Sequence, residues 1–128
     1  MNSLKPAVVG FALAVVVCFI MSKLEPRHGL DVLASILVAA AAVYVGSALS
    51  DERDGSRVLE TVLFLAFFVV AMIGLWYSPA LLAGGYVAHG VWDFFHHPHR
   101  IGARAGTFYP PFCLVADGVI AAFVLVRF

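Results

Sequence analysis

The chain has 128 residues, of which 62% are hydrophobic and 12% are charged, and its formal net charge is zero. Soluble domains carry about 25% charged residues, so the composition excludes an ordinary soluble domain and favours a polytopic membrane protein. The lack of a basic patch excludes nucleic acid as a partner. The length fits a single transmembrane domain over residues 1–128. Two cysteines, Cys18 and Cys113, are too few for a disulfide framework.

We expect an all-α integral membrane bundle of about five transmembrane helices. The expected helices span about residues 6–22, 32–49, 58–77, 79–97 and 110 to the C-terminus. Lengths of about 17 to 20 residues suit a hydrocarbon core of about 30 Å. No small-residue cleavage site follows the first apolar run, so we expect a retained helix rather than a signal peptide.

Between the first two helices we expect a polar turn over residues 23–31. In this interpretation Asp31 caps the second helix and His28 lies in the turn. With five spans, the basic residues near the expected helix ends divide unequally between the two sides of the membrane. One side carries Lys5, Arg53, Arg57, Arg100 and Arg104, and the other carries Lys23, Arg27 and Arg127. This bias predicts a cytoplasmic N-terminus, and we expect the protein in a bacterial inner membrane.

The strongest functional signal is the segment of residues 89–97, His-Gly-Val-Trp-Asp-Phe-Phe-His-His. At 3.6 residues per turn, the side chains of His89, Asp93, His96 and His97 share one face of a helix. Ionisable groups are expensive inside a bilayer, so they indicate a functional site with a specific partner.

Two further acidic residues are expected at the same level of the bundle. Glu60 lies near the start of the third expected helix, and Asp117 lies inside the fifth. A rise of about 1.5 Å per residue places both within about 10 Å of the membrane face where the fourth helix ends. Three helices therefore bring histidines and carboxylates to one leaflet.

Imidazole and carboxylate ligands together suit a divalent metal ion, for which we expect iron or zinc, with one or two ions per chain. The candidate ligands are His89, Asp93, His96, His97 and Asp117. Cys113, four residues before Asp117, could add a softer ligand. Glu60 or His96 is the candidate catalytic proton-transfer group.

Each residue also has a structural interpretation. His89 could be a core histidine hydrogen-bonded between helices, and Asp93 could form an ion pair between helices. His96 and His97 could lie at the interface with lipid headgroups. Glu60 lies near a helix start, where the helix dipole favours an acid.

The stretch of residues 89–97, together with Cys113-Leu-Val-Ala-Asp117, resembles an uncharacterised family of small multi-pass membrane proteins. That family carries a His-x-Gly-Trp-Asp-x-x-His-His segment and a C-terminal Cys-x-x-x-Asp. The resemblance implies that these residues form one unit, and it implies no mechanism. A more distant similarity connects the segment to the histidine boxes of membrane hydroxylases and desaturases, which use more histidines than this chain has.

The leading hypothesis is therefore a metal-dependent membrane enzyme, oxidoreductase or hydroxylase-like rather than a hydrolase. Its partners would be membrane lipid and an apolar or amphiphilic substrate, and homo-oligomers are left open. The alternatives are a metal-ion or proton transporter, because intramembrane Asp and His chains also carry ions, and a structural subunit in which the polar cluster joins helices.

Overall fold

Five α-helices make up nearly all of the chain that the structure describes. It is a computed structural model, and it describes residues 2–50, 54–96, 102–103 and 105–128. In chain order the helices are α1 (Leu4–Lys23), α2 (Pro26–Leu49), α3 (Asp54–Trp76), α4 (Pro79–His96) and α5 (Tyr109–Arg127). Within these ranges no strand occurs. The prediction of an all-α fold with five helices is confirmed.

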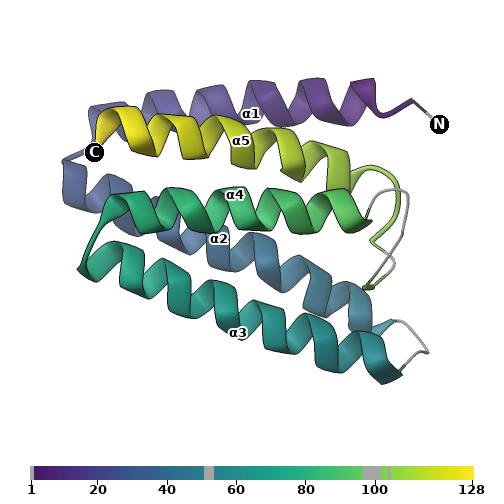
Figure 1. Ribbon diagram of the computed structural model, residues 1–128. Helices are drawn as coiled ribbons and strands as arrows, with labels where there is room; N and C mark the ends of the chain where they lie inside the picture. Colours follow the sequence, from purple (N-terminus) through teal and green to yellow (C-terminus); the bar gives the residue numbers. More distant parts are fainter. Residues whose placement is uncertain (1, 51–53, 97–101, 104) are drawn as a thin grey trace.

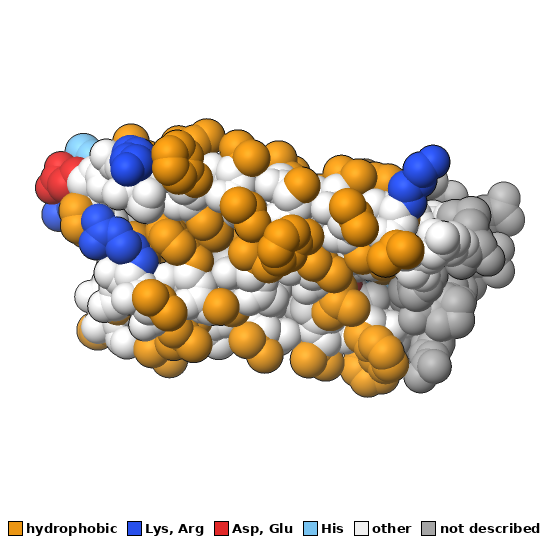
Figure 2. All heavy atoms as spheres, turned by 90° about the horizontal axis from the view of Figure 1, so that it is seen from above, with side chains coloured by type: hydrophobic (Ala, Val, Ile, Leu, Met, Phe, Trp, Pro, Cys, Tyr) orange, Lys and Arg blue, Asp and Glu red, His pale blue; other side chains and the backbone are white. Residues whose placement is uncertain are grey.

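Four of the helices, α1, α2, α3 and α5, are long and apolar enough to cross a membrane. The other, α4, has 18 residues, but His89, Asp93 and His96 lower its hydropathy. Large apolar side chains face outward along the bundle, among them Phe11 and Phe19. Figure 2 shows hydrophobic side chains along the whole of the face seen from above, with most of its charged side chains at the end where α1 ends and α2 begins. This distribution is consistent with a membrane protein.

The expected polar turn over residues 23–31 is wrong, because α1 ends at Lys23 and α2 already begins at Pro26. The break is short because Glu25 precedes a proline and takes an extended conformation, with ψ 137°. Pro26 can itself open the helix, since the first helical position needs no N–H donor. His28 and Asp31 therefore lie within α2 and are exposed. Asp31 does not cap the helix, and its carbonyl accepts a hydrogen bond from the Ser35 hydroxyl at 2.8 Å.

The helices run alternately up and down the bundle, as Figure 1 shows. Helix α5 packs between α1 and α4, α4 packs on α3, and α3 packs on α2, whereas α1 and α2 touch each other far less. At Gly10 of α1, an added Cβ would collide with the backbone carbonyl of Phe112, so the missing side chain lets α1 approach α5 closely. The ends of α2 and α4 and the starts of α3 and α5 meet at one end of the bundle (Figure 1).

Candidate metal centre

The polar face predicted for the fourth helix exists. His89, Asp93 and His96 of α4 are at most 1% exposed, and all three side chains point into the bundle. Their spacing of four and three residues keeps them on one side of the helix. His89 lies seven residues before the end of α4, which is about 10 Å along the axis. The site is therefore inside the bundle, near the end where α3 and α5 begin.

A four-ligand group forms around His89, consisting of His89, Asp93, Cys113 and Asp117. The imidazole Nδ1 lies 2.7 Å from Oδ2 of Asp117 and 3.4 Å from Oδ2 of Asp93. The Sγ atom of Cys113 lies 3.8 Å from the same Nδ1 and 3.8 Å from both carboxylate oxygens of Asp117. One candidate ligand atom from each of the four residues falls within 4.8 Å of the others. Helices α4 and α5 supply two ligands each.

Two atoms of this group lack a hydrogen-bond partner within the described part of the chain. These are Nε2 of His89 and Oδ2 of Asp93, and both are buried. A buried polar atom without a partner costs free energy. One Nδ1 hydrogen cannot satisfy Asp93 and Asp117 at the same time, so the group holds more acceptors than donors.

Aromatic side chains surround the four-ligand group. The hydroxyl of Tyr44, on α2, donates a hydrogen bond to Oδ1 of Asp93. The Phe67 ring of α3 lies edge-on to the His89 imidazole, with centroids 5.0 Å apart. Tyr109, one turn before Cys113, lies with its hydroxyl 3.5 Å from Sγ. These rings limit the access of water, and a low dielectric strengthens the interaction of the carboxylates with any cation.

A second buried pair lies nearer the end of the bundle. Nε2 of His96 lies 2.6 Å from Oε1 of Glu60, on α3, and Nδ1 of His96 lies 2.8 Å from the backbone carbonyl of Trp92. Glu60 also accepts hydrogen bonds from the Trp92 indole at 3.2 Å and from the backbone N–H of Ala103 at 3.0 Å. Every nitrogen of His96 and both oxygens of Glu60 therefore have partners.

The structure thus brings together three of the five predicted metal ligands, His89, Asp93 and Asp117. Cys113, the softer ligand considered from the sequence, completes the four-ligand group. His96 lies apart from that group and pairs with Glu60, the other candidate proton-transfer residue. His97 lies outside the described residues.

Sequence reasoning missed Tyr44 and Ala103. Tyr44 is a single tyrosine in an apolar run, and its partner Asp93 is 49 residues away, so no spacing connects the two. The available signal was the hydroxyl itself, since a buried tyrosine usually finds a hydrogen-bond partner. Ala103 contributes only its backbone N–H, which no side-chain pattern reveals.

Comparison with known proteins identifies a family for the chain. Residues 3–127 match the model of a family described as a family of unknown function (DUF6010). No curated protein and no solved structure matches the chain. The match covers both buried groups, and it confirms the uncharacterised family expected from the sequence.

Proposed function

The chain belongs to the family of unknown function DUF6010, and we propose that it is an integral membrane metalloenzyme. In this proposal His89, Asp93 and Asp117 bind one divalent cation, and Cys113 is the fourth ligand. The observation that carries the proposal is the convergence of four ligand atoms within 4.8 Å inside the bundle. In a tetrahedral site, bonds of about 2.0–2.3 Å place the ligand atoms about 3.3–3.8 Å apart, so a pair of ligand atoms at the 4.8 Å limit would approach by about 1 Å on binding.

Charge supports a metal ion over a structural network. Two buried carboxylates face one imidazole nitrogen, and no lysine or arginine contacts them among the described residues. A divalent cation offsets most of the negative charge of the two carboxylates and the Cys113 thiolate, and it supplies the missing partner of Oδ2 of Asp93. Intramembrane hydrogen bonds between helices are worth only about 1 kcal/mol each, so cohesion alone is a weak reason to bury this group.

The donor set favours iron or zinc. One imidazole, two carboxylates and one thiol combine hard and soft ligands, and both metals accept such a mixture. A single ion per chain accounts for the four-ligand group. The Glu60–His96 pair offers no second set of ligands, since its atoms hydrogen-bond to one another, to the Trp92 indole and to the backbone.

For the reaction, we favour oxidation of an apolar substrate over hydrolysis. Hydrolysis needs water, whereas apolar side chains surround the cavity beside Cys113 and Asp117. A hydroxylation would require iron, because zinc has no redox chemistry, and it would insert one oxygen atom of dioxygen into a C–H bond. The other oxygen atom would leave as water, with two electrons and two protons from a separate reductant. Glu60 and His96 are the groups nearest the bundle end that could pass on protons.

Cobalt substitution tests the ligand set. Co²⁺ added to the purified protein in detergent, after a chelator has removed the resident metal, should produce visible absorption, with a thiolate-to-metal charge-transfer band from Cys113. Cys113→Ser should remove that band, and Cys18→Ser should keep it, because Cys18 is also buried but lies outside the group. Absence of any cobalt spectrum in the wild-type protein would contradict the proposal. A spectrum without the thiolate band would leave three ligands and remove Cys113 from the set.

A further inference from the structure

A cavity connects the four-ligand group with the outer surface of the bundle. Because α1 packs on α5 and hardly touches α2, a space remains between α1 and α2, and α5 forms its floor. This cavity has a volume of about 270 Å³, just below the range of about 300–1,000 Å³ for ligand pockets. Cys113 and Asp117 line it directly. An apolar molecule in this cavity would therefore contact two of the four ligands.

The lining of the cavity is apolar except where α5 carries the site. Helices α1 and α2 contribute only aliphatic side chains, including Leu13, Val17 and Ala39. The polar side chains in the lining, Tyr109, Cys113 and Asp117, all come from α5. Such a lining fits a hydrocarbon chain, with one polar side at the depth of the metal centre.

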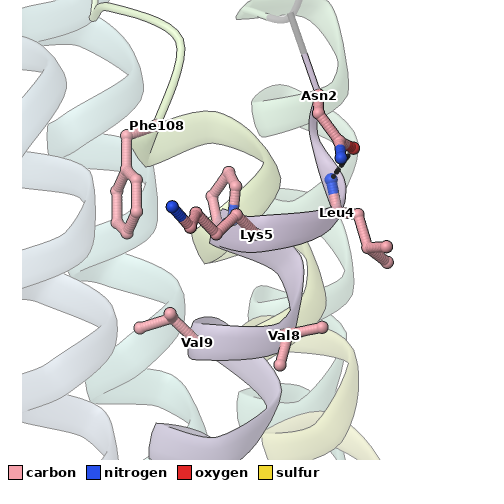
Figure 3. Close-up of a pocket in the computed structure, with 7 residues that line it drawn as sticks. Asn2, Leu4, Lys5, Val8, Val9 and Phe108 are labelled. Carbon is pink, nitrogen blue, oxygen red and sulfur yellow. Dashed lines mark hydrogen bonds between the residues drawn. The ribbon is translucent and has the colours of Figure 1, made fainter.

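A second hollow, of about 630 Å³, lies nearer the start of α1 and is lined in part by Lys5, Val9 and Phe108. Lys5, Val9, Leu13 and Val17 follow one another at intervals of four residues, which places them on one face of α1. Figure 3 shows Lys5 and Val9 extending from α1 to the side where Phe108 lies. Phe108 in turn stacks on Phe112, a lining residue of the first cavity. We treat the two hollows, which share no lining residue, as parts of one groove along α1 and call it the α1–α2 groove. Helix α2 lines its inner part, and the Lys5 ammonium group lies at its outer end.

We propose that the α1–α2 groove binds one acyl chain of an anionic membrane phospholipid. The phosphate would lie at Lys5, and methylene groups in the middle of the chain would lie beside Cys113 and Asp117. Lys5 is exposed at the end of a membrane-crossing helix, where lipid phosphates are found. This inference rests on the proposed function, since the metal would act on the chain that the groove presents.

The length of the groove decides which part of the lipid meets the site. Gly10 of α1 meets the Phe112 backbone, so Cys113 lies near the level of Phe11, six residues or about 9 Å along α1 from Lys5. A phosphate at Lys5 therefore puts the ester groups well short of Cys113, and the chain interior reaches it. The substrate class is then a phospholipid acyl chain that reacts at an internal C–H bond.

Photo-crosslinking in lipid nanodiscs tests this assignment. The probe is phosphatidylglycerol with a diazirine in the middle of one acyl chain, and mass spectrometry locates the adducts. We expect adducts on residues 13–17 of α1 and 112–116 of α5. Ala39→Phe, which fills the groove, should abolish them. Ala122→Phe, at an exposed position of α5 outside the lining, should leave them unchanged.

The headgroup is tested with Lys5→Gln and with the phosphatidylcholine analogue of the probe. The wild type should label more with the anionic lipid, and Lys5→Gln should reduce that preference roughly fivefold. Labelling spread evenly over the outer surface, or unaffected by Ala39→Phe, would overturn the groove. His89→Ala should keep the adducts, since the groove does not need the metal. Metal binding without localised adducts would thus overturn the groove alone, and localised adducts without metal binding would overturn the metal proposal alone.

Discussion

The ring of Tyr44 stacks on the imidazole of His96, with centroids 3.8 Å apart and an angle of 22° between the planes. The hydroxyl of the same tyrosine donates a hydrogen bond to Asp93. Tyr44 therefore contacts both buried groups, the four-ligand group through its hydroxyl and the Glu60–His96 pair through its ring. In metal proteins, a hydrogen bond to a ligating carboxylate orients that ligand, and this is the role we assign to Tyr44.

Tyr44→Phe should weaken metal binding while the ring stack remains. Removal of the hydroxyl leaves Oδ1 of Asp93 without its donor, and the loss of such a partner lowers metal affinity by about 10–100-fold. Competition of the purified protein against a fluorescent chelator measures this affinity. Tyr77→Phe is the control, because Tyr77 is 80% exposed. Equal affinities for both variants would show that the hydroxyl of Tyr44 does not support the site.

Glu60→Gln should destabilise the bundle without removing the metal. The Glu60 carboxylate is 2% exposed and lies 2.6 Å from His96, and breaking a buried pair costs about 3–5 kcal/mol. Glu25→Gln is the matched control, since Glu25 forms a pair with His28 in which both side chains are about two-thirds exposed. A surface pair contributes about 1 kcal/mol or less. Thermal unfolding in detergent compares the stability of the Glu60→Gln and Glu25→Gln variants. A reduced metal content in Glu60→Gln would contradict the prediction and would place Glu60 in the metal centre.

Gly102→Ala should disturb the Glu60–His96 pair more than Gly106→Ala does. Both glycines have a positive φ, 81° and 73°, so each alanine has a similar backbone strain of about 1–2 kcal/mol. A Cβ at Gly102 would also lie 2.6 Å from Nε2 of His96, whereas one at Gly106 would meet nothing within 4 Å. The measurement is the melting temperature of the two variants. Equal decreases in melting temperature would show that a side chain at position 102 does not disturb the Glu60–His96 pair.

The helices could be predicted because long apolar runs separated by polar or proline-containing segments determine them. The main error, the start of α2, arose from its polar residues. Arg27, His28 and Asp31 resemble a loop in sequence, yet a helix can carry them on an exposed face beyond the apolar region. Hydropathy averaged over a sequence window groups these residues with the break before them. The backbone of the structure shows instead that they are part of the helix.

Part of the site followed from helical spacing, which relates His89 to Asp93 and Cys113 to Asp117. Spacing cannot say which face of another helix lies opposite, so it did not separate His96 from the metal ligands. The partner of His96 is Glu60, 36 residues earlier, and that pairing depends on how α3 packs against α4. Tyr44 was not predicted as a site residue for the same reason, because its contact with Asp93 depends on how α2 packs against α4.

Elemental analysis of the purified protein tests the central claim most directly. The account predicts near-stoichiometric iron or zinc, which His89→Ala and Asp117→Asn abolish. His28→Ala and Asp31→Asn, the same kinds of change at exposed positions of α2, should retain the metal in full. A wild-type protein that holds no metal and binds none when iron or zinc is added back would contradict the account. So would His89→Ala and Asp117→Asn variants that keep the wild-type content.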